Sequence, residues 1–169
     1  DRTWIGNPQP DFIYGLNLNL EYKNFDFTAF FQGVHNVDVV SNVKRHTDFW
    51  SVQDTYGNKG RRLLDAFDPV TNPDSDIPSV SSVDDNNEGR MSTYYVENGS
   101  YLKLRNVQLG YTLPKELSER IKLSKLRLYV SGQNLWTLKS KSFTGKDPEN
   151  PNYGYPIPIT FTMGLNASF

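Results

Sequence analysis

The chain of 169 residues is long enough for one domain or for one segment of a larger protein. Its 18 basic and 19 acidic residues give a net charge of −1, so we expect no general affinity for nucleic acid. Because there is no cysteine and there are only two histidines, we expect no disulfide, no metal site and no bound cofactor. The 14% of aromatic residues, against 22% of charged residues, argues against a disordered chain.

Five stretches in which apolar and polar residues alternate predict an all-β, antiparallel fold. No window approaches about eighteen consecutive apolar residues, which excludes a transmembrane helix but not a transmembrane strand, whose signal is alternation. The five strands are expected at about 12–22, 25–34, 101–113, 126–138 and 157–169.

Only two residues, 23–24, separate the first two alternating runs. This spacing is typical of a tight hairpin, in which Tyr22 would face Phe25 and Leu20 would face Phe27. Both apolar rows would then lie on the same face of the sheet.

The length of the alternating runs favours strands that cross a membrane. Strands of soluble proteins have about 5–6 residues, whereas membrane-spanning strands need about 9–11. Aromatic residues lie near the ends of the apolar rows, as in the girdles of outer-membrane barrels. We therefore predict a transmembrane antiparallel β-barrel with a polar lumen. The residues expected to face the lumen are Asn17, Asn19, Glu21, Asp26, Arg127 and Gln133.

Five strands cannot close such a barrel, because the smallest bacterial barrels have about 8. The sequence begins at Asp1 without a methionine, a basic segment or an apolar leader, so we expect an internal start within a longer chain. The remaining strands would come from the preceding part of that chain.

The connections between the strands alternate in length. Turns at 23–24 and 114–125 are short, with a helical turn expected to begin at Pro114, whereas loops at about 35–99 and 139–156 are long. Outer-membrane barrels have short periplasmic turns and long extracellular loops, so we expect Asp1 on the extracellular side and Phe169 at the periplasmic rim. Within the first loop, residues 59–67 have the spacing of a short amphipathic helix or of a locally packed segment.

The end of the chain resembles the β-signal recognised by the outer-membrane barrel assembly machinery. That signal combines a polar residue, a glycine, a hydrophobic residue and a terminal aromatic residue at fixed spacing. The matching residues are Thr162, Gly164, Ala167 and Phe169.

Four stretches resemble the C-terminal part of SusC/RagA-family TonB-linked outer-membrane transporters. They are residues 129–138 and 147–169, together with 5–33 (IGNPQPDFIYGLNLNLEYKNFDFTAFFQG) and 95–114 (YVENGSYLKLRNVQLGYTLP). The resemblance covers nearly the whole chain except the middle of the long loop. This sequence would supply the last five strands of a 22-stranded type of barrel in a Gram-negative outer membrane.

The resemblance also implies a function and a set of partners. A barrel of this family imports oligosaccharides or peptides under a SusD-like surface lipoprotein that acts as a lid, with energy relayed by TonB. The expected partners are this lipoprotein, the rest of the barrel and its plug, TonB through the absent N-terminal part, the barrel assembly machinery and membrane lipid. A basic group from the plug, or Arg127, is expected to neutralise Glu21 and Asp26, which the hairpin register places face to face.

Exposed aromatic rings in the loops suit stacking on sugars or contact with a peptide or the lid. Each ring is also a candidate anchor that packs its own loop. The candidates are Trp50, Tyr56, Tyr94, Tyr95 and Tyr101.

We expect no enzyme activity, because nothing in the sequence fixes the separation of two loop carboxylates as glycoside hydrolysis requires. The acidic run at 84–88 is expected to be a hydrated loop rather than a calcium site, because it lacks the EF-hand spacing. Two other hypotheses stay open: a soluble, secreted glycan-binding β-domain, and a TonB-linked siderophore or vitamin receptor.

Overall fold

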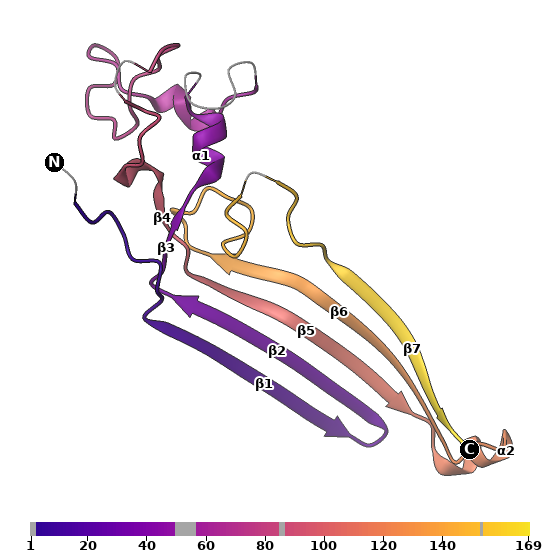
Figure 1. Cartoon of the computed structure of the whole chain (residues 1–169). Coiled ribbons are helices and arrows are strands. Elements are labelled where there is room, and N and C mark those ends of the chain that lie inside the picture. Colours follow the sequence, from indigo (N-terminus) through magenta and orange to yellow (C-terminus); the bar gives the residue numbers. More distant parts are fainter. Residues whose placement is uncertain (1–2, 50–56, 85–86, 153) are drawn as a thin grey trace. The chain divides into compact units, whose positions relative to one another are not determined.

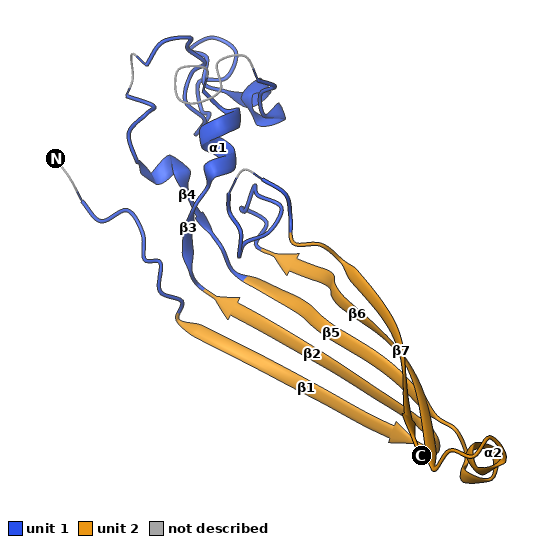
Figure 2. Ribbon diagram, turned by 45° about the vertical axis from the view of Figure 1, so that its right-hand side comes forward, with its two compact units in different colours: residues 1–10, 36–100, 140–156 blue, residues 11–35, 101–139, 157–169 orange. Residues whose placement is uncertain are grey.

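The computed structural model describes residues 3–49, 57–84, 87–152 and 154–169. The chain forms two compact units (Figure 2). We call residues 11–35, 101–139 and 157–169 the sheet unit, and residues 1–10, 36–100 and 140–156 the loop unit. None of the described helices is long and apolar enough to cross a membrane.

The sheet unit is one antiparallel sheet of five strands, and each strand pairs with the strand of this same sheet that follows it in the sequence (Figure 1). The order across the sheet is β1-β2-β5-β6-β7. The strand bounds are Phe12–Tyr22 for β1, Phe25–His35 for β2, Tyr101–Thr112 for β5, Lys125–Lys139 for β6 and Thr160–Ser168 for β7.

Strand β7 begins later than the alternation suggests. The apolar–polar pattern predicts a start near residue 157, but the first residue of β7 is Thr160. Pro158 explains the difference, because proline has no backbone N–H to donate to the neighbouring strand.

The β1–β2 hairpin has the register that its two-residue turn predicts. Tyr22 pairs with Phe25, and Leu20 pairs with Phe27. Lys23, in the turn, has a φ of 54°, the left-handed conformation that such tight turns need.

The register keeps apolar and polar residues in separate rows across the sheet. One apolar row contains Leu20, Phe27, Leu109, Val130 and Met163. The adjacent residues on the other face form a polar row of Asn19, Thr28, Gln108, Ser131 and Thr162. Leu109 is 46% exposed and Met163 is 82% exposed, so the apolar face is open to its surroundings rather than packed in a core.

A short helix closes the turn between β5 and β6. Helix α2 spans Lys115–Arg120, and Pro114 is its N-cap rather than its first helical residue, one position from the expected place. The Ser118 hydroxyl donates to the carbonyl of Lys115, and the backbone N–H of Leu113 donates to the carbonyl of Leu126, which ties the turn to the strand ends.

The long loop expected at about 35–99 contains short helices and strands that the sequence did not reveal. Strands of three residues give too few positions for a period of two to show. Residues 59–67, for which a short amphipathic helix or a locally packed segment was expected, contain a short 3₁₀ turn. The elements are β3 (Asp38–Val40), α1 (Asn42–Thr47), η1 (Arg61–Asp65), η2 (Thr93–Tyr95) and β4 (Val96–Asn98), with β3 paired to β4.

Candidate functional site

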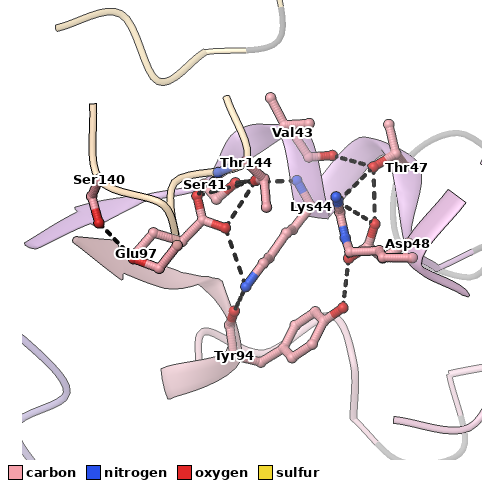
Figure 3. Close-up of polar contacts among 11 residues, drawn as sticks. Ser41, Val43, Lys44, Thr47, Asp48, Tyr94, Glu97, Ser140 and Thr144 are labelled. Carbon is pink, nitrogen blue, oxygen red and sulfur yellow. Dashed lines mark hydrogen bonds and ion pairs between the residues drawn. The ribbon is translucent and has the colours of Figure 1, made fainter. Parts of the chain in front are cut away.

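A buried carboxylate joins three elements of the loop unit (Figure 3). Asp48 follows α1 and is 0% exposed. Its Oδ2 accepts from Arg62 Nε at 2.7 Å and from the Tyr94 hydroxyl at 2.6 Å, and its Oδ1 accepts from the Thr47 hydroxyl at 2.9 Å. Arg62 completes a two-pronged ion pair through its Nη2. Burying a carboxylate is unfavourable unless it is paired and hydrogen-bonded, and Asp48 is both.

The surroundings of Arg62 and Tyr94 raise the pKa of both groups. Burial raises the pKa of the Tyr94 phenol, and its hydrogen bond to Asp48 raises it further. Burial alone would lower the pKa of Arg62, but the hydrogen bonds and the negative charge of Asp48 outweigh it, so that the pKa is raised. Tyr94 therefore stays a neutral donor and Arg62 a cation near neutral pH, which suits a structural cross-link rather than proton transfer.

A second buried carboxylate, Glu97 of β4, lies in the same network and is 4% exposed. Its Oε1 lies 3.2 Å from Lys44 Nζ and 2.8 Å from the Thr144 hydroxyl, and its Oε2 accepts from the Thr144 backbone N–H at 3.0 Å. Lys44 Nζ also donates to the carbonyl of Tyr94 at 2.8 Å. Ser41, the N-cap of α1, lies 3.1 Å from the Thr144 hydroxyl (Figure 3). Glu97 thus fastens the segment 140–156 to α1 and β4.

Two of the five predicted contact aromatics, Tyr95 and Tyr101, are buried. Tyr95 is 1% exposed, stacks edge-on against Phe49 and Tyr94, and donates its hydroxyl to the carbonyl of Glu88. Burial raises the pKa of Tyr95 to about 12. Tyr101 is also buried, and the contact role expected for these two rings stays a prediction.

Tyr94 is partly exposed, and its role as a contact residue stays a prediction. Trp50 and Tyr56 lie outside the described residues.

The residues predicted to face a lumen share the polar face of the sheet. The register places Glu21 beside Asp26, and Arg127 of β6 makes a two-pronged ion pair with Asp26. Asn17 lies in one row with Phe30, Asn106 and Gln133, and Asn19 lies opposite Thr28. Of the two basic groups expected to offset the opposed carboxylates, one from the plug or Arg127, the structure places Arg127 on Asp26.

Replacing Arg127 by alanine is expected to lower the free energy of unfolding of the complete protein by about 1 kcal/mol, because Asp26 would face Glu21 without its cation. Denaturant titration of the purified protein measures the change. The double variant R127A/D26N removes the repulsion as well as the attraction, so it is expected to recover most of the loss. A double variant no more stable than R127A would contradict the electrostatic explanation.

The residues that resemble an assembly signal lie on or next to β7. Thr162 and Gly164 are on the polar face, where they pair with Ser131 and Tyr129, and Ala167 is on the apolar face. The Tyr129 ring covers Gly164 so closely that an added Cβ would lie 2.5 Å from it. Phe169 follows the strand and is 98% exposed.

One of the exposed loop carboxylates, Asp68, belongs to the turn in which it lies. Asp68 accepts from the backbone N–H groups of Val70 and Thr71, which lower its pKa and make it the cap of its own turn. Among the described residues, no group of three histidine, cysteine or acidic side chains is placed to hold a metal ion. In the acidic run at 84–88, residues 85 and 86 lie outside the description.

Comparison with known proteins gives a consistent family. No protein-family model matches the chain. TonB-dependent receptors P3 and P26 of Formosa agariphila are 37% and 33% identical over the whole chain, and TonB-dependent receptor SusC of Bacteroides thetaiotaomicron is 28% identical. The chain spans only 16–18% of the length of these relatives.

Solved structures agree with the relatives. The RagAB peptide importer in its open-open and closed-closed states matches 95% of the chain, at 25% identity and TM-scores of 0.74 and 0.75, over 17% of the importer chain. The antiparallel sheet described above is thus shared with this importer, and the chain is a segment of a SusC-like TonB-dependent transporter.

Proposed function

We propose that the complete protein imports oligosaccharides or peptides across the outer membrane in a TonB-dependent manner. In this proposal the sheet unit forms the last five strands of the barrel wall, and the loop unit forms extracellular loops. The names of the relatives support import, since they are TonB-dependent receptors, SusC among them, and the solved neighbours are peptide importers.

The uncovered apolar face of the sheet is the observation that carries the proposal. Leu16, Leu20, Leu109 and Leu165 are between 46% and 64% exposed and lie on this face, whereas the opposite face is polar. In water such a face is costly, at about 25 cal/mol per Å² of apolar area, but against lipid tails the cost disappears. A soluble glycan-binding domain needs a second layer over this face, so its exposure counts against that hypothesis.

The two outer strands of the sheet support a larger barrel. All eleven residues of β1 are exposed, and β1 and β7 each pair with a single neighbour. A strand edge left open in lipid costs several kcal/mol per unpaired backbone group. The rest of the barrel would cover these edges, with a plug in its lumen.

The orientation and the partners complete the proposal. The turns at residues 23–24 and 113–124 would face the periplasm, and Phe169 would lie at the periplasmic rim of the barrel. The residues that resemble the β-signal, Thr162, Gly164, Ala167 and Phe169, would pair with the assembly machinery. A SusD-like lipoprotein would cover the loop unit, and TonB would act through the preceding part of the protein. A gene for such a lipoprotein next to this one would separate the SusC-like importer from a siderophore or vitamin receptor.

Expression of the full-length protein in a host that lacks it tests the proposal. We expect the protein to stay in the outer-membrane pellet until detergent is added, a SusD-like lipoprotein to co-purify with it, and uptake of its ligand to stop when TonB is deleted. Release of the protein by salt or alkali without detergent, or uptake that is independent of TonB, would refute the proposal.

A further inference from the structure

The end of the sheet that carries its two short turns is strongly basic. Residues 22–25 and 111–125, which we call the basic rim, contain five basic and two acidic residues, a net charge of +3. The whole chain carries −1, so the remainder carries −4. We propose that the basic rim binds phospholipids with anionic headgroups in the membrane leaflet around it, an inference that rests on the proposed barrel function and names a lipid partner for its periplasmic end.

The two turns belong to one continuous surface. The backbone N–H of Thr112, at the end of β5, donates to the carbonyl of Asn24 in the β1–β2 turn at 2.8 Å. Helix α2 lies at the same end of the sheet as the β1–β2 turn (Figures 1 and 2). All of the basic rim belongs to the sheet unit, so its place relative to the apolar face is defined.

A row of aromatic residues borders the rim on the apolar face. Tyr22 pairs with Phe25, and Phe25 pairs with Tyr111, two residues along each strand from the apolar row of Leu20. Tyr22 is 70% exposed and Phe25 is 50% exposed, and the ring centroids of Phe25 and Tyr111 are 4.8 Å apart. Aromatic residues in this position are typical of the level at which lipid tails meet headgroups. The basic rim therefore begins where headgroups would lie.

The Lys23 ammonium is on the lipid side of the sheet rather than on the lumen side. Its Nζ lies 5.3 Å from the centroid of the Tyr22 ring, and Tyr22 belongs to the apolar face. A lysine can lay its aliphatic stem along apolar surface while its charge stays among polar groups. Lys23 is thus placed to meet the phosphate of a lipid whose tails cover the apolar face.

Helix α2 and the residues after it add the same combination of apolar and basic side chains. Leu117 is 47% exposed and Ile121 is 53% exposed, and Arg120 and Lys122 are exposed beside them. Ser118 is 1% exposed, so the helix has an inner side that is covered and an outer side that is not. Exposed apolar residues next to cations are typical of segments that lie at the surface of an anionic membrane.

Two of the five basic residues are less suited to lipid. Lys125 shares the polar face of β6 with Arg127, and Lys115 Nζ lies 3.7 Å from Glu119 Oε1, which offsets its charge. Lys23, Arg120 and Lys122 therefore carry the inference. One lysine or arginine near an anionic membrane surface favours binding by about fivefold, and this preference is absent for a zwitterionic headgroup.

The lipids that stay with the full-length protein test the inference. The protein is placed in nanodiscs of equal parts phosphatidylglycerol and phosphatidylcholine, extracted with mild detergent, and its retained lipids are counted by mass spectrometry. We expect phosphatidylglycerol to exceed phosphatidylcholine at least about fivefold, and the excess to fall as salt is added, because exposed charges are screened. The triple variant K23Q/R120Q/K122Q is expected to retain the two lipids in nearly equal amounts.

The matched control removes one arginine and two lysines from the loop unit instead. Arg61, Lys141 and Lys146 are exposed there, and R61Q/K141Q/K146Q is expected to keep the phosphatidylglycerol excess. The gel-mobility difference between folded and unfolded barrels shows that both triple variants are folded. An equal loss of the excess in both would mean that total charge, not the basic rim, selects the lipid, and would overturn the inference.

An excess that persists in K23Q/R120Q/K122Q, or equal retention of the two lipids by the unaltered protein, would also overturn it. These results are separate from the proposed function. A protein that needs detergent to leave the membrane but retains both lipids equally would refute the basic rim alone, whereas release without detergent would refute the barrel function itself.

Discussion

Replacing Leu18 by arginine is expected to lower the free energy of unfolding of the complete barrel by about 2–4 kcal/mol, since the guanidinium would lie in the hydrocarbon layer. Leu18 is near the middle of β1, on the apolar face beside Ala29 of β2, and is 40% exposed. Urea titration of the full-length protein in lipid vesicles, followed by the gel-mobility difference between folded and unfolded barrels, measures this loss.

Asn19→Arg is the matched control for this prediction. Asn19 is the next residue of the same strand and pairs with Thr28 on the polar face, so its arginine would reach water. We expect a small change in stability for this variant. Equal losses for the two variants would mean that the two faces of β1 meet the same surroundings, and the barrel interpretation would then be wrong.

Replacing Asp48 by alanine is expected to destabilise the loop unit by about 3 kcal/mol, because one partner of a buried ion pair is removed while the other remains. Arg62 and Tyr94 would both lose their acceptor, and Arg62 is only 24% exposed, so water restores the lost bonds incompletely. Hydrogen exchange at 41–48, 61–65 and 93–97 is expected to become faster. Exchange in the strands of the sheet unit is the internal reference.

Asp68→Ala is the control for Asp48→Ala, because it shows how much hydrogen exchange changes when an exposed carboxylate of the loop unit is removed. Asp68 is exposed and accepts from the backbone N–H groups of Val70 and Thr71 in its own turn, so its removal is expected to change exchange near residues 68–72 alone. The double variant D48A/R62A is expected to lose less than the sum of its single variants, since the uncompensated cation is gone. Additive losses would argue against the buried pair as the source of the effect.

The sheet was predictable because its strands are long. Strand β1 has eleven residues, so the alternation of apolar and polar residues repeats often enough to be recognised. A turn of two residues then fixes the register in which Tyr22 pairs with Phe25. The late start of β7 had a signal as well, since Pro158 has no N–H to donate. The need for a cation near Asp26 followed from the register, which places it opposite Glu21, and Arg127 was one of the two sources expected for it.

The polar network of the loop unit had no comparable signal. Asp48 meets Tyr94 across 46 residues of sequence, and Glu97 meets Thr144 across 47, distances over which no local pattern links two side chains. The burial of Tyr95 was equally hidden, because an aromatic ring in a polar loop has the same sequence context whether it anchors the loop or contacts a ligand. Such contacts depend on loop closure, which composition and periodicity do not encode.

Glu97 has a mechanical consequence for the loops. Its carboxylate accepts a hydrogen bond from Thr144 and forms an ion pair with Lys44. The Lys44 ammonium in turn donates to the carbonyl of Tyr94. If residue 144 is displaced, these contacts must break, or the first turn of α1 and the η2 segment must move with it. A displacement of residue 144 would therefore be transmitted to α1, about a hundred residues earlier in the chain, both through Glu97 and through the direct contact between Thr144 and Ser41.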